Sequence, residues 1–218
     1  MNAMKPLCVD LFCGFFLGWT EGFLAEGYRV VGYDVIEKPY RIPDGFSYVR
    51  QDVRTLDGHR FSGATCIVAS PPCQEFTRLR FLRHNPPPPD MSCVEAVWRI
   101  RKESGIPTVL ENVEGARVFI GPTTIHRGPW YLWGDVPLLN GGKLPPKVGA
   151  RPWSSRRFRA GDLLPDGTRP PLQAWGMRKR SGMGAAERSK IPLALARAVA
   201  RGMLPANPPA KPRKELEE

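Results

Sequence analysis

Five short apolar segments recur along the first half of the chain, and each ends at or near a residue with a reactive or hydrogen-bonding side chain. They span residues 7–12, 29–34, a shorter extended piece ending at Asp52, 65–70 and 108–113. Segments of this length with little polar interruption are typical of buried parallel strands. Helical spacing of apolar residues over 19–27, 91–104 and 191–204 predicts helices around them. The alternation predicts an α/β fold with a doubly wound, mostly parallel sheet.

The first of these units joins a strand to a helix through a glycine-containing turn. The strand over 7–12 is followed by Cys13-Gly14-Phe15-Phe16-Leu17-Gly18, and the helix begins at about Trp19. A strand, a glycine turn and a helix form the unit that binds nucleotide-like cofactors, because glycine lets a ligand approach the backbone closely. Two glycines alone are also compatible with an ordinary strand-to-helix turn.

Acidic residues follow the strand ends in series. Asp10, Asp34 and Asp52 lie on three successive predicted strands, and an acid at the end of the second strand commonly binds ribose hydroxyls in dinucleotide folds. Glu111 lies near the end of the fifth apolar segment, where burial is costly unless the carboxylate is paired or works in a reaction. Each acid taken singly could equally be a loop residue or a helix cap, but the series indicates a binding edge.

The fourth apolar segment ends at Ser70-Pro71-Pro72-Cys73. Neither proline can donate a backbone hydrogen bond, so the sheet ladder should stop there. Cys73 should then lie at the carboxyl end of a strand, where open α/β sheets bind ligands. The alternative interpretation is a small apolar residue packed at a strand end.

Composition indicates which kind of molecule the protein binds and in which cellular compartment it works. The net charge is +11 with an isoelectric point near 9.8, which favours a polyanionic partner, nucleic acid before membrane, over a basic protein with no such partner. The five cysteines form no CxxC or Cys/His cluster, so we expect a reducing cytoplasm and neither a zinc site nor a disulfide framework. The sequence lacks an apolar run long enough for a membrane span and a signal-peptide core.

Basic residues concentrate in two irregular regions. The segment 75–90, with four consecutive prolines, is interpreted as a long loop, and residues 116–184 are rich in Pro, Gly, Trp and Arg. We predict nucleic-acid contacts from Arg78, Arg80, Arg83, Arg178, Lys179 and Arg180. The alternative for 116–188 is an irregular subdomain whose aromatic residues form a small core. We therefore divide the chain into 1–115 plus 189–204 as the catalytic and cofactor-binding domain, 116–188 as a recognition region and 205–218 as a flexible tail.

Taken together, the motifs resemble those of the DNA cytosine-5 methyltransferases. In chain order they are Asp10-Leu11-Phe12-Cys13-Gly14 with Gly18-Trp19-Thr20-Glu21-Gly22-Phe23, Asp34, Asp52, Ser70-Pro71-Pro72-Cys73-Gln74 and Glu111-Asn112-Val113. The order is that of the family, and the matching covers residues 7–113. Beyond it, Ser155-Arg156-Arg157-Phe158-Arg159 is similar to the family's Gln-x-Arg-x-Arg motif with Ser155 in place of Gln. The resemblance implies a Rossmann-like S-adenosylmethionine-dependent methyltransferase in a compact, phage-like form.

The resemblance also implies site roles. Cys73 would add to C6 of a cytosine flipped out of the duplex, and Glu111 would protonate or hydrogen-bond ring N3. Arg157 and Arg159 would hold the base, and Gln74 would contact nucleic acid. The donor would be S-adenosylmethionine, with S-adenosylhomocysteine as product and no metal. Its contacts would come from Asp10, Phe12, Gly14, Gly18, Asp34 at the ribose, Val35, Asp52 at the adenine amino group, Val53 and Pro71.

Two departures from the family pattern shape the remaining expectations. The turn Gly14-Phe15-Phe16-Leu17-Gly18 replaces a Gly-x-Gly-Gly turn, which leaves a modified S-adenosylmethionine open as donor. The short region before the last helix predicts a recognition sequence of about two to four base pairs. We expect a monomer acting on double-stranded DNA in the cytoplasm of a bacterium or a phage-infected host, without a membrane partner. An RNA cytosine-5 methyltransferase and a non-catalytic nucleic-acid-binding relative remain the alternatives.

Overall fold

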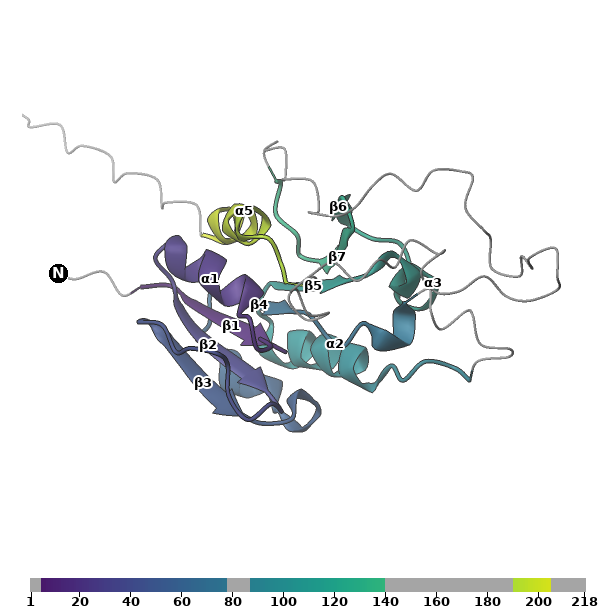
Figure 1. Ribbon diagram of the computed structural model, residues 1–218, viewed down its shortest axis with the longest axis horizontal. Helices are drawn as coiled ribbons and strands as arrows, with labels where there is room; N and C mark the ends of the chain where they lie inside the picture. Colours follow the sequence, from purple (N-terminus) through teal and green to yellow (C-terminus); the bar gives the residue numbers. More distant parts are fainter. Residues whose placement is uncertain (1–4, 78–86, 140–189, 205–218) are drawn as a thin grey trace, which may run out of the picture.

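A computed structural model describes residues 5–77, 87–139 and 190–204, and these ranges form a seven-stranded sheet with helices on both faces (Figure 1). The strands are β1 (Leu7–Leu11), β2 (Arg29–Asp34), β3 (Phe46–Arg50), β4 (Cys66–Ala69), β5 (Thr108–Asn112), β6 (Ile125–Arg127) and β7 (Trp130–Gly134). Their order across the sheet is β3-β2-β1-β4-β5-β7-β6. The first five are parallel, whereas β7 runs antiparallel to β5 and β6 antiparallel to β7.

This strand order confirms the predicted doubly wound α/β fold. The run β3-β2-β1-β4-β5 is the Rossmann order, in which the chain reverses direction across the sheet between β1 and β4. Ligands of such sheets bind outside the carboxyl ends of the strands at this switch point. The topology therefore places the ends of β1 and β4 at the centre of the expected site.

The helices divide into two layers. Helices α1 (Gly18–Ala25) and α5 (Leu193–Met203) cover one face, and α2 (Ser92–Ser104) covers the other together with the 3-10 turns η1 (Val53–Thr55) and η2 (Gly58–Phe61) (Figure 1). Alternate residues of the strands face the two layers: Cys8 packs toward α1 and α5, and Val9 packs toward α2. The shorter elements are η3 (Gln74–Phe76), η5 (Glu114–Ala116) and α3 (Arg117–Ile120).

Helices α1 and α5 pack closely because α1 carries glycine at the contact. A Cβ added to Gly22 would overlap Ala196, and one added to Gly18 would lie 2.7 Å from the backbone nitrogen of Ile191. Tyr28 adds a link between the two ends of the chain, since its buried hydroxyl donates a hydrogen bond of 2.9 Å to the carbonyl of Ala200. The apolar helix predicted near the end of the chain therefore docks on the first helix.

The sheet continues beyond residue 115, into the segment that the sequence assigned to a recognition region. Strands β6 and β7 lie beyond it and complete the sheet, with Leu132 and Trp133 of β7 buried. The antiparallel pairing of β7 with β5 joins residues that lie about twenty positions apart in the sequence. Strand β3 also ends at Arg50, so Asp52 lies in the following turn rather than on a strand.

In the described part of the chain, no helix is long and apolar enough to cross a membrane.

Candidate active site

A cavity of about 470 Å³ opens at the carboxyl ends of β1, β2, β4 and β5. It gathers most of the residues that the sequence predicted for the cofactor and the reaction: Phe12, Gly14, Gly18, Asp34, Val35, Asp52, Val53, Pro71, Cys73, Gln74 and Glu111. The volume falls in the range of pockets that bind small molecules and cofactors. One continuous space thus connects the acids of the first strands with the cysteine and glutamate of the later ones.

The turn after β1 is held in an unusual backbone conformation. Phe12 and Leu17 have positive φ angles of 61° and 53°, a region that residues other than glycine seldom adopt, and Gly14 has a φ of 65°. Leu17 is fully buried, and the amides of Phe12 and Cys13 both donate to the carbonyl of Tyr33 on β2. Burial and these hydrogen bonds hold the strained turn in place, which is typical of ligand-binding loops.

Asp10 does not reach the cavity, so its predicted contact with the cofactor is corrected. Its side chain is fully buried beneath α1, where Oδ2 accepts hydrogen bonds from the amide and the hydroxyl of Thr20 at 3.0 and 2.6 Å. Burial raises the pKa of Asp10 to about 7, although the two bonds from Thr20 act in the opposite direction. Asp10 therefore caps the first turn of α1 from inside, a task that Leu17 at the N-cap position cannot perform.

Asp34 shapes the same turn from the end of β2. Its carboxylate accepts hydrogen bonds from the amide of Gly14 at 2.9 Å and from the amide of Val35 at 2.7 Å. The side chain lines the cavity, so Asp34 lies where a ribose-binding acid is predicted. Val35 beside it is more than half exposed.

Phe15 and Phe16, the bulky residues of the turn, line the cavity and contact a third ring. Their centroids lie 5.8 and 6.0 Å from that of Tyr40, in the loop after β2. The hydroxyl of Tyr40 donates to Glu21 on α1, which also accepts from Lys190 at 2.6 Å. Burial alone would raise the pKa of Glu21, but the bonds from Lys190, Tyr40 and Arg41 lower it. The three neighbouring rings of Phe15, Phe16 and Tyr40 are thereby linked to α1 through Glu21.

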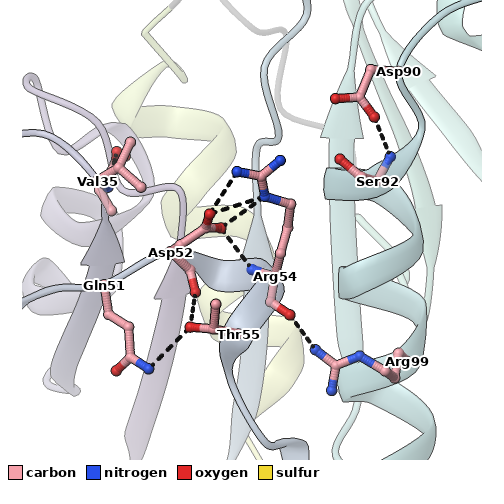
Figure 2. A network of polar contacts seen from close by, with 9 residues as sticks. Val35, Gln51, Asp52, Arg54, Thr55, Asp90, Ser92 and Arg99 are labelled. Atoms are coloured by element: carbon pink, nitrogen blue, oxygen red, sulfur yellow. Dashed lines mark hydrogen bonds and ion pairs between the residues drawn. The ribbon is translucent and has the colours of Figure 1, made fainter.

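Asp52 is tied to Arg54, a cavity residue that the sequence analysis did not single out (Figure 2). The Arg54 guanidinium donates to both carboxylate oxygens, with an Nη2–Oδ2 distance of 2.6 Å, and the Arg54 amide donates to Oδ1. The Arg54 hydrogen bonds hold the pKa of Asp52 below its usual range. The Arg54 carbonyl in turn accepts from Arg99 on α2. The two-residue spacing of Asp52 and Arg54 was the available signal, since an Asp side chain commonly bonds the backbone two residues on.

The loop that carries Cys73 is fixed on both sides. Asn112, buried at the end of β5, donates from Nδ2 to the carbonyl of Pro71 at 3.0 Å. On the other side, the amide of Phe76 donates to the Cys73 carbonyl at 3.0 Å, and the Phe76 ring is buried. The sheet ladder ends before the two prolines, as predicted. Cys73 is therefore presented at the cavity by a constrained backbone.

Four cysteines other than Cys73 lie in the described part of the chain. Cys8, Cys13 and Cys66 are buried, and burial raises the pKa of the Cys8 and Cys13 thiols. Cys93 on α2 also lines the cavity, but burial raises the pKa of its thiol as well. A raised pKa disfavours the thiolate, which is the nucleophilic form. Cys73 is half-buried, as is Cys93, and it lies in the loop after β4, the strand that pairs with the strand of Glu111.

Glu111 is oriented by a hydrogen-bonded row that the sequence did not reveal. The Ser70 hydroxyl donates to Oε2 of Glu111 at 2.9 Å, and Nε1 of Trp19 donates to the Ser70 hydroxyl at 2.9 Å. Trp19 is buried, and it also lines the cavity. Its second role depends on a contact with a strand end some fifty residues away, which no local pattern indicates.

Several predicted contact residues lie outside the described residues. They are Arg78, Arg80, Arg83, Arg157, Arg159, Arg178, Lys179 and Arg180, together with the tail 205–218. Among residues 5–77, 87–139 and 190–204, no group of three or more His, Cys, Asp or Glu side chains could hold a metal ion.

Comparisons with known proteins add only partial likenesses. No protein-family model matches the chain, and a search of curated proteins gave no match. Among solved structures, the aminoglycoside resistance methyltransferase NpmB1 is similar at 18% identity with a TM-score of 0.32, over 51% of this chain and 56% of that one. A 16S rRNA (adenine(1408)-N(1))-methyltransferase from Catenulisporales acidiphilia is similar at 13% identity with a TM-score of 0.36, over 55% and 57%. The chain thus spans a little over half the length of each, and the fold assignment rests on the strand order itself.

Proposed function

We propose that this protein is an S-adenosylmethionine-dependent methyltransferase that modifies C5 of cytosine in DNA. The observation that carries the proposal is the convergence of Cys73 and Glu111 on the cavity that also holds Asp34 and Asp52. A thiol, a carboxyl group and two cofactor-binding acids are the set that this reaction requires, and the motifs that supply them stand in the family's order. The net charge of +11 suits a polyanionic substrate.

The residues present fit the proposed donor. The cavity of about 470 Å³ is bordered by the Gly14 turn, where φ is positive and no Cβ stands in the way, and by the carboxylate of Asp34. S-adenosylmethionine supplies an electrophilic methyl carbon when bound. Asp34 would hold the ribose, and Asp52, with Arg54, would face the adenine amino group. The rings of Phe15 and Phe16 would border the bound molecule where the family carries glycine.

Cys73 would make cytosine reactive by adding to it. The C5 carbon of cytosine is a weak nucleophile until a group adds at C6. The Cys73 thiolate would form the bond to C6, and Glu111 would give a proton or a hydrogen bond to N3, so that electron density collects on C5. After C5 has gained its substituent, loss of the C5 proton and departure of the Cys73 thiolate would restore the aromatic ring. The base must first leave the duplex stack to enter the cavity.

DNA is favoured over RNA by one feature of the sequence. The branch of the family that modifies transfer RNA shares Ser70-Pro71-Pro72-Cys73-Gln74 followed by Phe76-Thr77, but its Cys-Phe-Thr tripeptide is absent here. Because the two branches share these motifs, the test includes both polymers.

The proposed activity is tested by incubating the full-length protein with labelled S-adenosylmethionine and either duplex DNA or RNA. We expect label in the DNA, with the modified base identified as 5-methylcytosine by base-resolution mapping. Cys73→Ser should lower transfer by at least about a thousandfold, because the weaker oxygen nucleophile cannot replace the thiolate. Cys93→Ser is the matched control, since it removes another half-buried cysteine that lines the cavity. Transfer to RNA alone would favour the transfer-RNA branch, and transfer to neither polymer would reject the proposal.

A further inference from the structure

A row of three hydrogen-bonded side chains runs from α1 across the end of β4 to β5. Nε1 of Trp19 donates to Oγ of Ser70 at 2.9 Å, and Oγ of Ser70 donates to Oε2 of Glu111 at 2.9 Å. The three residues come from three elements that lie far apart in the sequence. The strand register of the sheet brings two of them together, because β4 and β5 are parallel neighbours.

The direction of this row is fixed by the chemistry of the indole group. An indole N–H can donate a hydrogen bond but cannot accept one. Ser70 must therefore be the acceptor toward Trp19, and its single hydroxyl proton is free to point to Oε2 of Glu111. Trp19 is only 2% exposed, so leaving its N–H without an acceptor would be costly, and the Ser70 oxygen is held in place.

The row reaches Glu111 at one of its two carboxyl oxygens, since Oε2 accepts the Ser70 hydroxyl. This bond ties the orientation of the carboxyl group to the end of β4. Hydrogen bonds in a partly buried site are electrostatically stronger than in water, and donation from Trp19 strengthens the bond that Ser70 makes.

We infer that Ser70 and Trp19 are positioning residues that hold the Glu111 carboxyl group in one orientation at the cavity. The inference rests on the proposed function for its use, because Glu111 then presents one oxygen to the ring nitrogen of the base. Trp19 acts through Ser70, and Ser70 acts through Glu111; neither needs to touch the base.

The row is tested first without any substrate, by NMR of the indole N–H of Trp19 in the full-length protein labelled with ¹⁵N. The signal is assigned with Trp19→Phe. We expect its chemical shift to change with pH. Part of that change should be lost in Glu111→Gln, because this variant has no carboxyl group at position 111. The same part should be lost in Ser70→Ala, which cuts the row, and retained in Ser62→Ala, which changes an exposed serine. A Trp19 signal that responds to Glu111 equally in wild type and Ser70→Ala overturns the inference, as does one that never responds to Glu111.

The second test measures transfer to duplex DNA. Ser70→Ala should lower kcat about tenfold to a hundredfold with KM for DNA changed less than about threefold, since positioning of an acid is lost while binding is kept. Trp19→Phe keeps the ring but not the N–H, so kcat should fall less, by about threefold to tenfold. The matched control Trp98→Phe, on α2 and away from the cavity, should retain wild-type kcat.

The pH profile separates positioning from a general loss of structure. The Ser70 hydroxyl stabilises the ionised carboxylate, so its removal makes Glu111 hold its proton to higher pH. The basic limb of the kcat profile should therefore move to higher pH in Ser70→Ala. An active wild type whose kcat and pH profile are unchanged in Ser70→Ala overturns this inference alone. A wild type without transfer activity counts against the proposed function. The NMR test then decides by itself whether Ser70 links Trp19 to Glu111.

Discussion

At the scale of single residues, acidic side chains at and near the site are already hydrogen-bonded to other residues of the protein. Asp10 was predicted as a cofactor contact, yet its carboxylate caps α1 from within. Asp52 lies at the cavity as predicted, but Arg54 occupies both of its oxygens. The sequence indicated which residues are acidic and where strands end, but it did not identify Thr20 as the partner of Asp10 or Arg54 as the partner of Asp52.

Asp10 provides a prediction about stability and pH. Its pKa is raised to about 7 by burial, and its Oδ1 has no hydrogen-bond partner among the described residues. Because the folded state holds the proton to higher pH than the unfolded chain does, folding takes up a proton between about pH 4 and pH 7. The contribution of Asp10 to the free energy of unfolding is about 4 kcal/mol. It is fully present below about pH 4 and is lost as the pH rises through 7.

The corresponding measurement compares thermal unfolding at about pH 5 and about pH 8, where the Asp10 contribution differs. Asp10→Asn stays neutral throughout, so we expect its melting temperature to change much less between the two conditions than that of the wild type. Asp44→Asn, in an exposed loop, should keep the wild-type difference. An equal difference in wild type and Asp10→Asn would show that Asp10 is ionised in the folded protein at both pH values.

At the scale of elements, the contact between α1 and α5 joins the start of the sheet to the last helix. The two glycines of α1 are what allow it: Gly18 faces Ile191, and Gly22 faces Ala196. Ile191 also lines the cavity. The packing of the last helix therefore supports the turn that borders the cavity, which gives α5 a structural link to the site.

Gly22→Ala should destabilise the protein by about 1–3 kcal/mol, because the added methyl group overlaps Ala196 and forces the helices apart. The measurement is urea unfolding followed by circular dichroism. Gly63→Ala is the matched control, since a Cβ there meets nothing within 4 Å, and it should be close to neutral. A Gly22→Ala protein as stable as Gly63→Ala would mean that α1 and α5 do not pack in this way.

At the scale of the whole molecule, the sequence predicted the fold through repeated local signals and missed what depends on distant pairing. Buried strands such as Cys66–Ala69 are recognisable because parallel strands are apolar on both faces. Strand β6 was missed because Ile125–Arg127 is short and half-exposed. The Cys73 and Glu111 positions were predictable from their motifs, whereas the Trp19–Ser70–Glu111 row required the folded sheet.

The central claim, that Cys73 adds to C6 of cytosine, is tested most directly by trapping the adduct. Duplex DNA carrying 5-fluorocytosine is suitable, because the final step must remove a C5 proton and fluorine cannot leave in its place. With S-adenosylmethionine present, we predict a covalent protein–DNA species by mass spectrometry, with the attached peptide mapped to Cys73 and no adduct in Cys73→Ser. Absence of any adduct with transfer-competent protein, or attachment at Cys93, would contradict the claim.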